Sequence, residues 1–204
     1  MAKLHFKYGT MNTGKSIDLI KAAYNYEENG FKVFVIKPLV DTKKGEYISS
    51  RIGLSRKVDL ILGENDNVIS SLSNKLNDIS VIFVDEAQFL KTNQIDDLYI
   101  ISKIIDVPVI CYGLRTNFKM ESFPGSRRLL EIADVLENLH SLCECGNISS
   151  VVGRKVNDKY VLSGKSIVID GTSNVEYVPL CAECYLQKVK KIDFNKYHKK
   201  IGRW

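Results

Sequence analysis

A glycine-rich segment near the start of the chain constrains the fold more than any other feature. Residues 9–16 read Gly-Thr-Met-Asn-Thr-Gly-Lys-Ser and match the pattern G-x-x-x-x-G-K-[ST] at every specified position. A short strand-like run over residues 4–8 precedes the segment, and apolar residues at near-helical spacing follow it from Ile17 to Tyr24. This order of strand, loop and helix is the context in which the pattern forms a phosphate-binding loop. A surface turn that matches by chance would leave both flanks unexplained.

The residue types in this segment suit the binding of a nucleoside triphosphate. Glycines at both ends allow a tight turn that brings backbone N–H groups toward the β- and γ-phosphates, at the positive end of the following helix. We expect Lys15 to neutralise phosphate charge and the Ser16 hydroxyl to ligate Mg²⁺. The predicted phosphate-binding residues are Gly9, Thr10, Met11, Asn12, Thr13, Gly14, Lys15 and Ser16.

A second signal is an apolar run that ends in two carboxylates. Residues 81–84 read Val-Ile-Phe-Val and are followed by Asp85 and Glu86. In proteins with a phosphate-binding loop, an acid at this strand end holds Mg²⁺ directly or through water, which is the role expected of Asp85. Glu86 is placed to accept a proton from an attacking hydroxyl or water. The alternative is an acidic strand end that only caps the next helix.

The chain continues as alternating strands and helices. Its apolar runs are short and are bounded by glycine, proline, asparagine or charged residues. This alternation predicts an α/β fold with a parallel sheet and helices on both faces, in which ligands bind at the carboxyl ends of the strands. We expect strands at residues 4–8, 31–36, 58–62, 81–84 and 107–112, and helices at residues 17–30, 66–76 and 93–105.

Two long connections interrupt this order. Residues 37–57 are polar and irregular, so we interpret them as a mobile functional loop. Residues 113–125 form a second loop at a strand's carboxyl end, and they include Phe118 and Phe123. These aromatic side chains are candidates for stacking on a planar ligand, although packing of the loop itself is the alternative.

Two cysteine pairs mark the last third of the chain. Cys143 and Cys145 form a C-x-C pair, Cys181 and Cys184 form a C-x-x-C pair, and β-rich sequence lies between them. Four thiolates suit tetrahedral zinc, and a cytoplasmic protein seldom uses disulfides, so a structural zinc ribbon is favoured over cystine. Cys111 lies within a predicted core strand and is interpreted as an inert buried thiol.

The net charge of +5 is concentrated at the end of the chain. Residues 188–204 contain seven basic residues and one acidic residue, so this segment carries +6 and the remainder carries −1. A solvated basic tail is therefore preferred over a nucleic-acid arm. No apolar run approaches the roughly 20 residues of a membrane helix, and the first strand begins too early for a signal peptide. We expect a cytoplasmic enzyme with no membrane or nucleic-acid partner.

Together these segments resemble the zinc-containing thymidine kinases, a family with a RecA-like P-loop fold. The resemblance covers nearly the whole chain. It rests on residues 9–16, Asp-Glu-Ala-Gln-Phe at 85–89, Tyr-Gly-Leu-Arg-Thr-Asn-Phe at 112–118, Phe123, Gly125-Ser126, and the cysteine pairs around Gly171 and Tyr177.

The resemblance implies transfer of the ATP γ-phosphoryl group to the 5′-hydroxyl of thymidine, and also of deoxyuridine. Glu86 would be the catalytic base, Gln88 and Asp85 would join the ATP site, and Asp41 would help Ser16 and Asp85 to bind Mg²⁺. Relatives of this kind form homotetramers that thymidine triphosphate inhibits. The implied thymidine-binding residues are Met11, Phe89, Leu114, Phe118, Phe123, Ile167, Val168, Ile169, Asp170 and Tyr177.

Two departures from the family pattern are visible. Lys43 stands where many members have arginine, so we expect a bidentate phosphate contact of the family to be weakened or relocated. The segment between Gly171 and Tyr177 is about two residues longer, near Thr172 and Ser173. This segment adjoins the lasso-like loop that reads the base edge in relatives.

We predict three regions and weigh two other classes of function. Residues 1–140 would form the nucleotide-binding domain, residues 141–190 the zinc-ribbon lasso domain, and residues 191–204 a basic tail. A nucleic-acid-dependent ATPase is one alternative, but a translocating helicase needs paired RecA-like domains and only one fits. A non-catalytic zinc module is the other, and the presence of both Lys15 and Glu86 argues against it. Within the kinase class, deoxycytidine or a purine deoxynucleoside is the alternative substrate.

Overall fold

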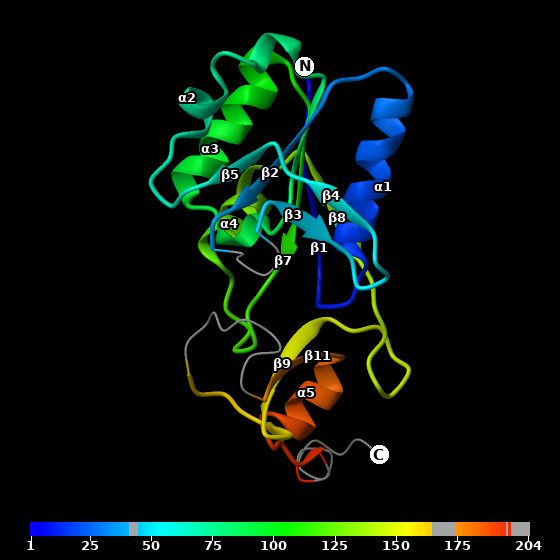
Figure 1. Cartoon of the computed structure of the whole chain (residues 1–204). Helices are drawn as coiled ribbons and strands as arrows, with labels where there is room; N and C mark the ends of the chain where they lie inside the picture. Colours follow the sequence, from blue (N-terminus) through cyan, green and yellow to red (C-terminus); the bar gives the residue numbers. More distant parts are fainter. Residues whose placement is uncertain (41–44, 165–173, 195, 197–204) are drawn as a thin grey trace. The chain divides into compact units, whose positions relative to one another are not determined.

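The chain folds into two compact units, which are described separately. The computed structural model describes residues 1–40, 45–164, 174–194 and 196. The first unit, here called the sheet unit, comprises Met1–Gly9, Thr13–Arg115 and Ser122–Leu139. The second, here called the cysteine unit, comprises Thr10–Asn12, Thr116–Glu121 and His140–Trp204. Figure 1 shows the elements of both units in sequence colours.

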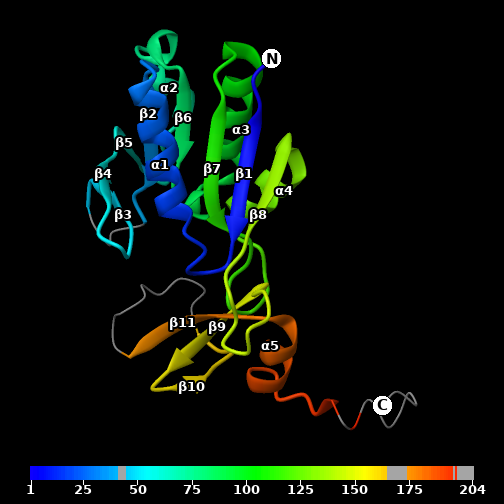
Figure 2. The same ribbon diagram turned by 90° about the vertical axis from the view of Figure 1, so that its right-hand side faces the viewer.

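A six-stranded sheet is the centre of the sheet unit. All neighbouring strands in it pair in parallel, as the alternation of strands and helices predicts. Figure 2 shows β6, β7, β1 and β8 side by side. In spatial order the strands are β5 (Leu60–Leu62), β2 (Val33–Pro38), β6 (Val81–Val84), β7 (Val109–Leu114), β1 (Leu4–Gly9) and β8 (Val135–Leu139).

Alternate residues of the buried strands face opposite sides of the sheet, and each side has its own core. Phe34 and Ile36 pack on one side, whereas Val35 packs on the other. The first side is covered by α2 (Val68–Leu72), α3 (Thr92–Ile100) and α4 (Pro124–Ile132). The second is covered by α1 (Lys15–Glu28), which lies across the sheet from α3 and α4 in Figure 1. The prediction of helices on both faces is therefore confirmed.

Several elements differ from the expected ones. The predicted loop at 37–57 contains a hairpin of β3 (Tyr47–Ser49) and β4 (Ser55–Lys57). The helix expected at 66–76 is shorter, because η1 (Leu76–Asp78) is a separate 3₁₀ turn. The helix expected at 93–105 changes to a π-helical turn, η3 (Ile101–Ile105). Helix α4 begins at Pro124, within the predicted loop at 113–125, and neither it nor β8 was predicted.

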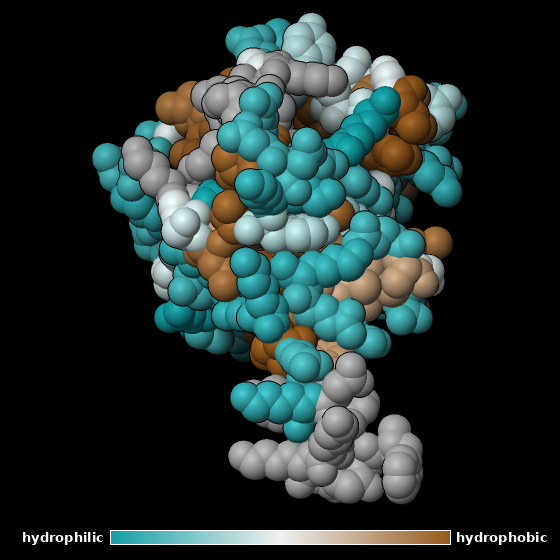
Figure 3. Space-filling model, turned by 90° about the horizontal axis from the view of Figure 1, so that it is seen from below, coloured by the Kyte–Doolittle hydropathy of each residue, from teal (hydrophilic) through white to brown (hydrophobic). Residues whose placement is uncertain are grey.

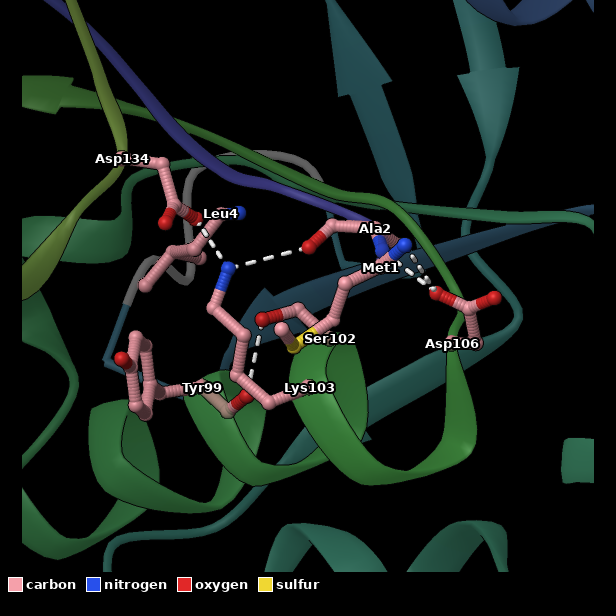
Figure 4. A network of polar contacts seen from close by, with 8 residues as sticks. All are labelled: Met1, Ala2, Leu4, Tyr99, Ser102, Lys103, Asp106 and Asp134. Carbon is pink, nitrogen blue, oxygen red and sulfur yellow. Dashed lines mark hydrogen bonds and ion pairs between the residues drawn. The ribbon is translucent and has the colours of Figure 1, made fainter.

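Polar contacts anchor the start of β1 to the end of α3 and η3, as Figure 4 shows. Lys103 Nζ donates to Ala2 O at 2.9 Å and to Asp134 Oδ2 at 2.5 Å. The Leu4 N–H also donates to Asp134 Oδ2, at 2.7 Å. Burial opposes ionisation of Asp134, but these hydrogen bonds outweigh it and lower the pKa of the carboxyl. The first strand is thus fixed at the end remote from the phosphate-binding loop.

The cysteine unit contains a small antiparallel sheet and one helix. The central strand β9 (Val151–Val156) pairs with β10 (Lys159–Tyr160) and with β11 (Val175–Leu180). Helix α5 (Ala182–Lys188) follows β11 directly. Among the described residues, this unit has a small hydrophobic cluster of Cys143, Val151, Leu180, Cys181, Cys184, Tyr185 and Val189, with Tyr160 and Val178 packed against it. A core of this size ordinarily needs a metal or disulfides for support.

The face of the molecule drawn in Figure 3 is mostly polar. Figure 3 shows one face on which hydrophilic residues predominate and hydrophobic residues form small separate groups. Among the described residues, no helix combines the length and apolar character needed to cross a membrane.

Candidate active site

The phosphate-binding loop begins where β1 ends. A Cβ atom at Gly9 would lie 2.6 Å from Leu139 O and 2.8 Å from Thr13 Oγ1, so only glycine fits this position. Gly14 has φ of 78° and caps the N-terminus of α1 in the left-handed region, where glycine carries no steric cost. The two glycines of the pattern therefore have separate roles: Gly9 permits close packing and Gly14 permits the turn.

Lys15 lies in the first turn of α1, in an environment that disfavours its charge. Its Nζ donates to Thr13 Oγ1 at 3.2 Å. Burial lowers the pKa of Lys15, and the negative charges of Glu86 and Asp85 partly oppose this effect. The loop lysine is therefore close enough to the acidic end of β6 for both carboxylates to influence its charge. An anionic ligand bound next to Lys15 would add to the negative charge of Glu86 and Asp85 and so favour the charged form of the lysine.

The acidic strand end is rigidly placed. All four residues of β6 are buried, and the Asp85 N–H donates to Ile36 O at 3.0 Å on the neighbouring strand. Asp85 is 4% exposed, whereas Glu86 is partly exposed. Glu86 has φ of 49°, a left-handed conformation uncommon for residues other than glycine, and the chain turns there into η2 (Ala87–Phe89). Unusual backbone of this kind is common where a side chain must be aimed.

Gln88 and two nearby residues connect this turn to the end of β7. The Gln88 amide donates to the Glu86 carboxylate and accepts the Leu114 N–H at 3.0 Å. Ser126 Oγ at the start of α4 donates to Leu114 O at 2.5 Å. Gly125 packs against η2 so closely that a Cβ would lie 2.5 Å from Ala87 O. The turn that carries Glu86 is thus held by β7 and by α4.

An ionic network below the loop was not predicted from the sequence. Lys7 Nζ lies 2.9 Å from Asp18 Oδ2 and 3.3 Å from Glu137 Oε2, and the buried Tyr112 hydroxyl donates to Asp18 at 2.9 Å. Burial opposes the charge of Lys7, but hydrogen bonds to both acids raise its pKa. Burial and the same acids also raise the pKa of Tyr112. Asp18, an acidic residue in the first turn of α1, was the sequence signal that could have indicated this network, since acids at this position usually interact with the helix dipole.

The predicted nucleoside-binding residues are divided between the two units. In the sheet unit, Phe89 and Phe123 meet edge to face with ring centroids 5.7 Å apart, and Leu114 ends β7. In the cysteine unit, the Arg154 guanidinium lies 3.7 Å from the ring centroid of Phe118. Tyr177 is opposite Arg154 in the β9–β11 register. The remaining predicted residues, Asp41, Ile167, Val168, Ile169 and Asp170, lie outside the described residues, as do Lys43, Thr172 and Ser173.

The middle of the phosphate-binding loop belongs to the cysteine unit. Thr10 Oγ1 lies 2.9 Å from Ser141 Oγ and 2.7 Å from Ser149 Oγ, and these two serine oxygens are 2.7 Å apart. We call this group the hydroxyl triangle. Ser141 Oγ also lies within hydrogen-bond distance of Met11 O, at 3.2 Å. The triangle therefore fastens Thr10 and Met11 to the segment around the first cysteine pair.

The four paired cysteines converge as the zinc hypothesis requires. Their sulfur atoms all lie within 4.8 Å of one another, and Cys145 Sγ is 3.7 Å from Cys181 Sγ. Zinc–sulfur bonds of about 2.3 Å in a tetrahedron place sulfurs about 3.8 Å apart, so the cluster fits zinc. Cys143 is buried, but nearby N–H groups and thiols lower its pKa to about 7, which favours the thiolate that binds metal. Cys111 is separate and buried, and burial raises its pKa.

The parallel sheet, the phosphate-binding loop and the acidic end of β6 define the chain as a P-loop protein. Comparison with known proteins makes the assignment more specific. The family model for thymidine kinase matches residues 2–185. The chain belongs to the thymidine kinase family, and it is therefore an enzyme of the transferase class, as its motifs predict.

Two relatives illustrate the extent of this match. The chain is 40% identical over 189 residues to a thymidine kinase from Streptococcus gordonii, covering 92% of this chain and 97% of the relative. It is 40% identical over 195 residues to a thymidine kinase from Enterobacteria phage T4, covering 94% of this chain and 100% of the relative. Among solved structures, a replication initiator DnaA bound to AMPPCP and single-stranded DNA matches with a TM-score of 0.43 and 18% identity, over 68% of this chain and 40% of that chain. That similarity is too low to bear on function.

Proposed function

We propose that the chain phosphorylates thymidine, and also deoxyuridine, at the 5′-hydroxyl with the γ-phosphoryl group of ATP, as a step of pyrimidine deoxynucleotide salvage. Membership of the thymidine kinase family supports the nucleoside. The observation that carries the mechanism is the shared environment of Lys15, Asp85 and Glu86, in which both acids oppose the effect of burial on the lysine. A cation beside two carboxylates is an arrangement suited to phosphoryl transfer.

Each residue of this group has a distinct chemical task in the proposal. Lys15 and the N–H groups at the start of α1 stabilise negative charge on the β- and γ-phosphates. Glu86 accepts the proton of the nucleoside 5′-hydroxyl as that oxygen attacks the γ-phosphorus. Its partial exposure leaves the carboxylate accessible to a substrate.

Hydroxyl and carboxylate oxygens supply the proposed magnesium site. Oxygen donors are the ligands that Mg²⁺ prefers, and Ser16 and Asp85 occupy the loop and strand positions where such donors occur in P-loop proteins. Asp41, outside the described residues, is proposed as a further contributor. Bound with ATP, the ion would neutralise charge on the phosphate oxygens. The cysteine cluster is proposed as the site of a structural zinc ion.

Apolar and aromatic residues supply the proposed nucleoside site. The packed pair Phe89 and Phe123, together with Leu114, offers apolar surface near the end of β7. Such surface favours the thymine methyl group and the faces of the base. The family resemblance adds Met11, Phe118 and Tyr177 to the proposed thymidine contacts. The family resemblance also supports our proposal of a cytoplasmic homotetramer inhibited by thymidine triphosphate.

A phosphotransfer assay with variants of Glu86 tests this function. The purified protein is incubated with Mg-ATP and with thymidine, deoxyuridine, deoxycytidine, purine deoxynucleosides or single-stranded DNA, while nucleoside monophosphate and ADP are both measured. We expect thymidine monophosphate and ADP to form in equal amounts. Glu86→Gln should lower turnover by roughly 10²- to 10⁴-fold without loss of ATP binding. Glu28→Gln, at an exposed carboxylate that ends α1, is the matched control.

Three results would contradict the proposal. Normal turnover of Glu86→Gln would remove the general base. ADP release stimulated by DNA without a nucleotide product would favour the ATPase alternative. Preference for deoxycytidine or a purine deoxynucleoside would assign a different substrate.

A further inference from the structure

Gln88 is buried and both ends of its amide are engaged. The side chain is 1% exposed and lies in η2, two residues after Glu86. Its Oε1 accepts the Leu114 N–H at 3.0 Å, and its Nε2 donates to Oε2 of the Glu86 carboxylate. The backbone N–H can only donate, so it fixes which end of the amide faces β7. The Nε2 end must then face Glu86, where it donates to an acceptor.

The end of β7 is shaped to receive this amide. A Cβ atom at Gly113 would lie 2.7 Å from Gln88 Oε1, so glycine leaves the space that the amide occupies. The peptide of Leu114 is held in turn, because its carbonyl accepts the Ser126 hydroxyl at 2.5 Å. The amide therefore bridges a fixed backbone group and a carboxylate on a different strand end.

We infer that Gln88 is a positioning residue for the Glu86 carboxylate in the phosphoryl-transfer step. This inference rests on the proposed function, in which Glu86 takes the proton of the nucleoside hydroxyl. A partly exposed glutamate has several rotamers, and a hydrogen bond from an amide that is itself fixed selects among them. Gln88 was expected among the ATP contacts, but in this structure both ends of its amide are engaged within the protein, by the Leu114 N–H and by Glu86. Its influence on the reaction passes through Glu86.

Replacing Gln88 with methionine removes both hydrogen bonds at similar side-chain volume. We expect Gln88→Met to lower kcat by roughly 10- to 100-fold, the effect of losing one hydrogen bond to a charged group. KM for ATP and for thymidine should stay within about twofold, because the residue contacts neither substrate. Gln94→Met is the matched control: Gln94 is also 1% exposed, and its amide bonds Gly63 O, Asp66 O and the Lys91 N–H. This control should leave kcat unchanged.

A double-mutant cycle decides whether Gln88 acts through Glu86. In the Glu86→Gln background, Gln88→Met should cause no further loss of kcat, since the group that it positions is already absent. The same fold-loss in both backgrounds, or a raised KM for ATP, would overturn the inference. Normal turnover of Glu86→Gln alone would instead refute the proposed function. The two failures are thus distinguishable.

A second variant covers the case in which Gln88→Met does not fold. Gly113→Ala displaces the amide oxygen without removing the amide, because the added methyl would lie only 2.7 Å from Gln88 Oε1. We expect Gly113→Ala to lower kcat at unchanged KM, and to have no effect in the Glu86→Gln background. Thermal melting of every variant is measured alongside, and an unchanged kcat in a folded Gly113→Ala protein would contradict the inference.

Discussion

Substituting Gly125 by alanine should push apart two elements that support the acidic turn. Gly125 lies in the first turn of α4, immediately after Pro124, and is fully packed against η2. An added Cβ would lie 2.5 Å from Ala87 O, 2.7 Å from Leu90 O and 3.2 Å from Gln88 O. All three atoms belong to the backbone of one tight turn, so none can move away without the others.

The size of the effect follows from these distances. The shortest contact must open from 2.5 Å to at least 3.0 Å, which requires α4 or η2 to shift as a unit. Overpacking of this kind costs about 1–3 kcal/mol. Alanine improves helix propensity over glycine by up to about 1 kcal/mol, and this gain offsets part of the cost. We expect a net destabilisation of about 1–2 kcal/mol.

Urea unfolding with a matched glycine variant measures this cost. A slope of about 2 kcal/mol/M converts the expected change into a midpoint lower by about 0.5–1 M. In Gly63→Ala the new Cβ would lie 2.8 Å from Asp66 Oδ2, a similar approach to a movable carboxylate rather than to backbone. That control should lose less than about 1 kcal/mol. If Gly125→Ala were no less stable than Gly63→Ala, the close approach of α4 to η2 would be refuted.

Two further predictions concern Lys15 and the cysteine cluster. Lys15→Met should abolish turnover and raise the unfolding midpoint at neutral pH without nucleotide, because burial lowers the pKa of Lys15 and the folded state bears the cost of its charge. The difference in unfolding midpoint between Lys15→Met and the wild-type protein should shrink as the pH rises from the folded-state pKa of Lys15 toward the ordinary 10.5, above which the lysine is neutral in both states. A difference that does not depend on pH would be inconsistent with a desolvated charge at Lys15. Replacing Cys181 and Cys184 by serine should release zinc and lower the melting temperature of the cysteine unit, whereas Cys111→Ala should retain the metal. Normal zinc content and melting of the double variant would contradict a structural zinc site.

The parts of the fold that could be predicted are those that local sequence determines. Strands β2, β6 and β7 are largely apolar runs and β1 alternates apolar with polar residues, and each was expected within a few residues of its observed limits. The β3–β4 hairpin was missed because Ser-Arg-Lys at 55–57 has no apolar pattern. Tertiary contacts hold it instead, including the two hydrogen bonds from Arg56 to Glu27 at 2.7 and 2.8 Å. Strand β8 was missed because it lies at the sheet edge, where its polar residues remain exposed.

The candidate site also combines residues that local sequence predicts with residues whose roles depend on contacts between distant parts of the chain. Lys15, Asp85 and Glu86 could be chosen from spacing alone, because the pattern itself encodes their chemistry. The partners of Gln88 could not be chosen in this way, since the Leu114 N–H is 26 residues away along the chain and is brought close only by the parallel register of the sheet. Asp18 is a similar case, because its partners Lys7 and Tyr112 come from two different strands.

The discontinuous make-up of the cysteine unit limits how this chain can be divided by engineering or by gene rearrangement. A cut after Leu139 would separate the last third from Thr10, and the hydroxyl triangle would lose one of its three corners. The same cut would remove Phe118, whose carbonyl accepts the Tyr185 hydroxyl at 2.6 Å. The C-terminal piece is therefore not a transferable module, even though its cysteines are contiguous with it in sequence. Circular permutation that keeps all three segments on one chain preserves these contacts, whereas grafting the C-terminal piece onto another P-loop protein does not.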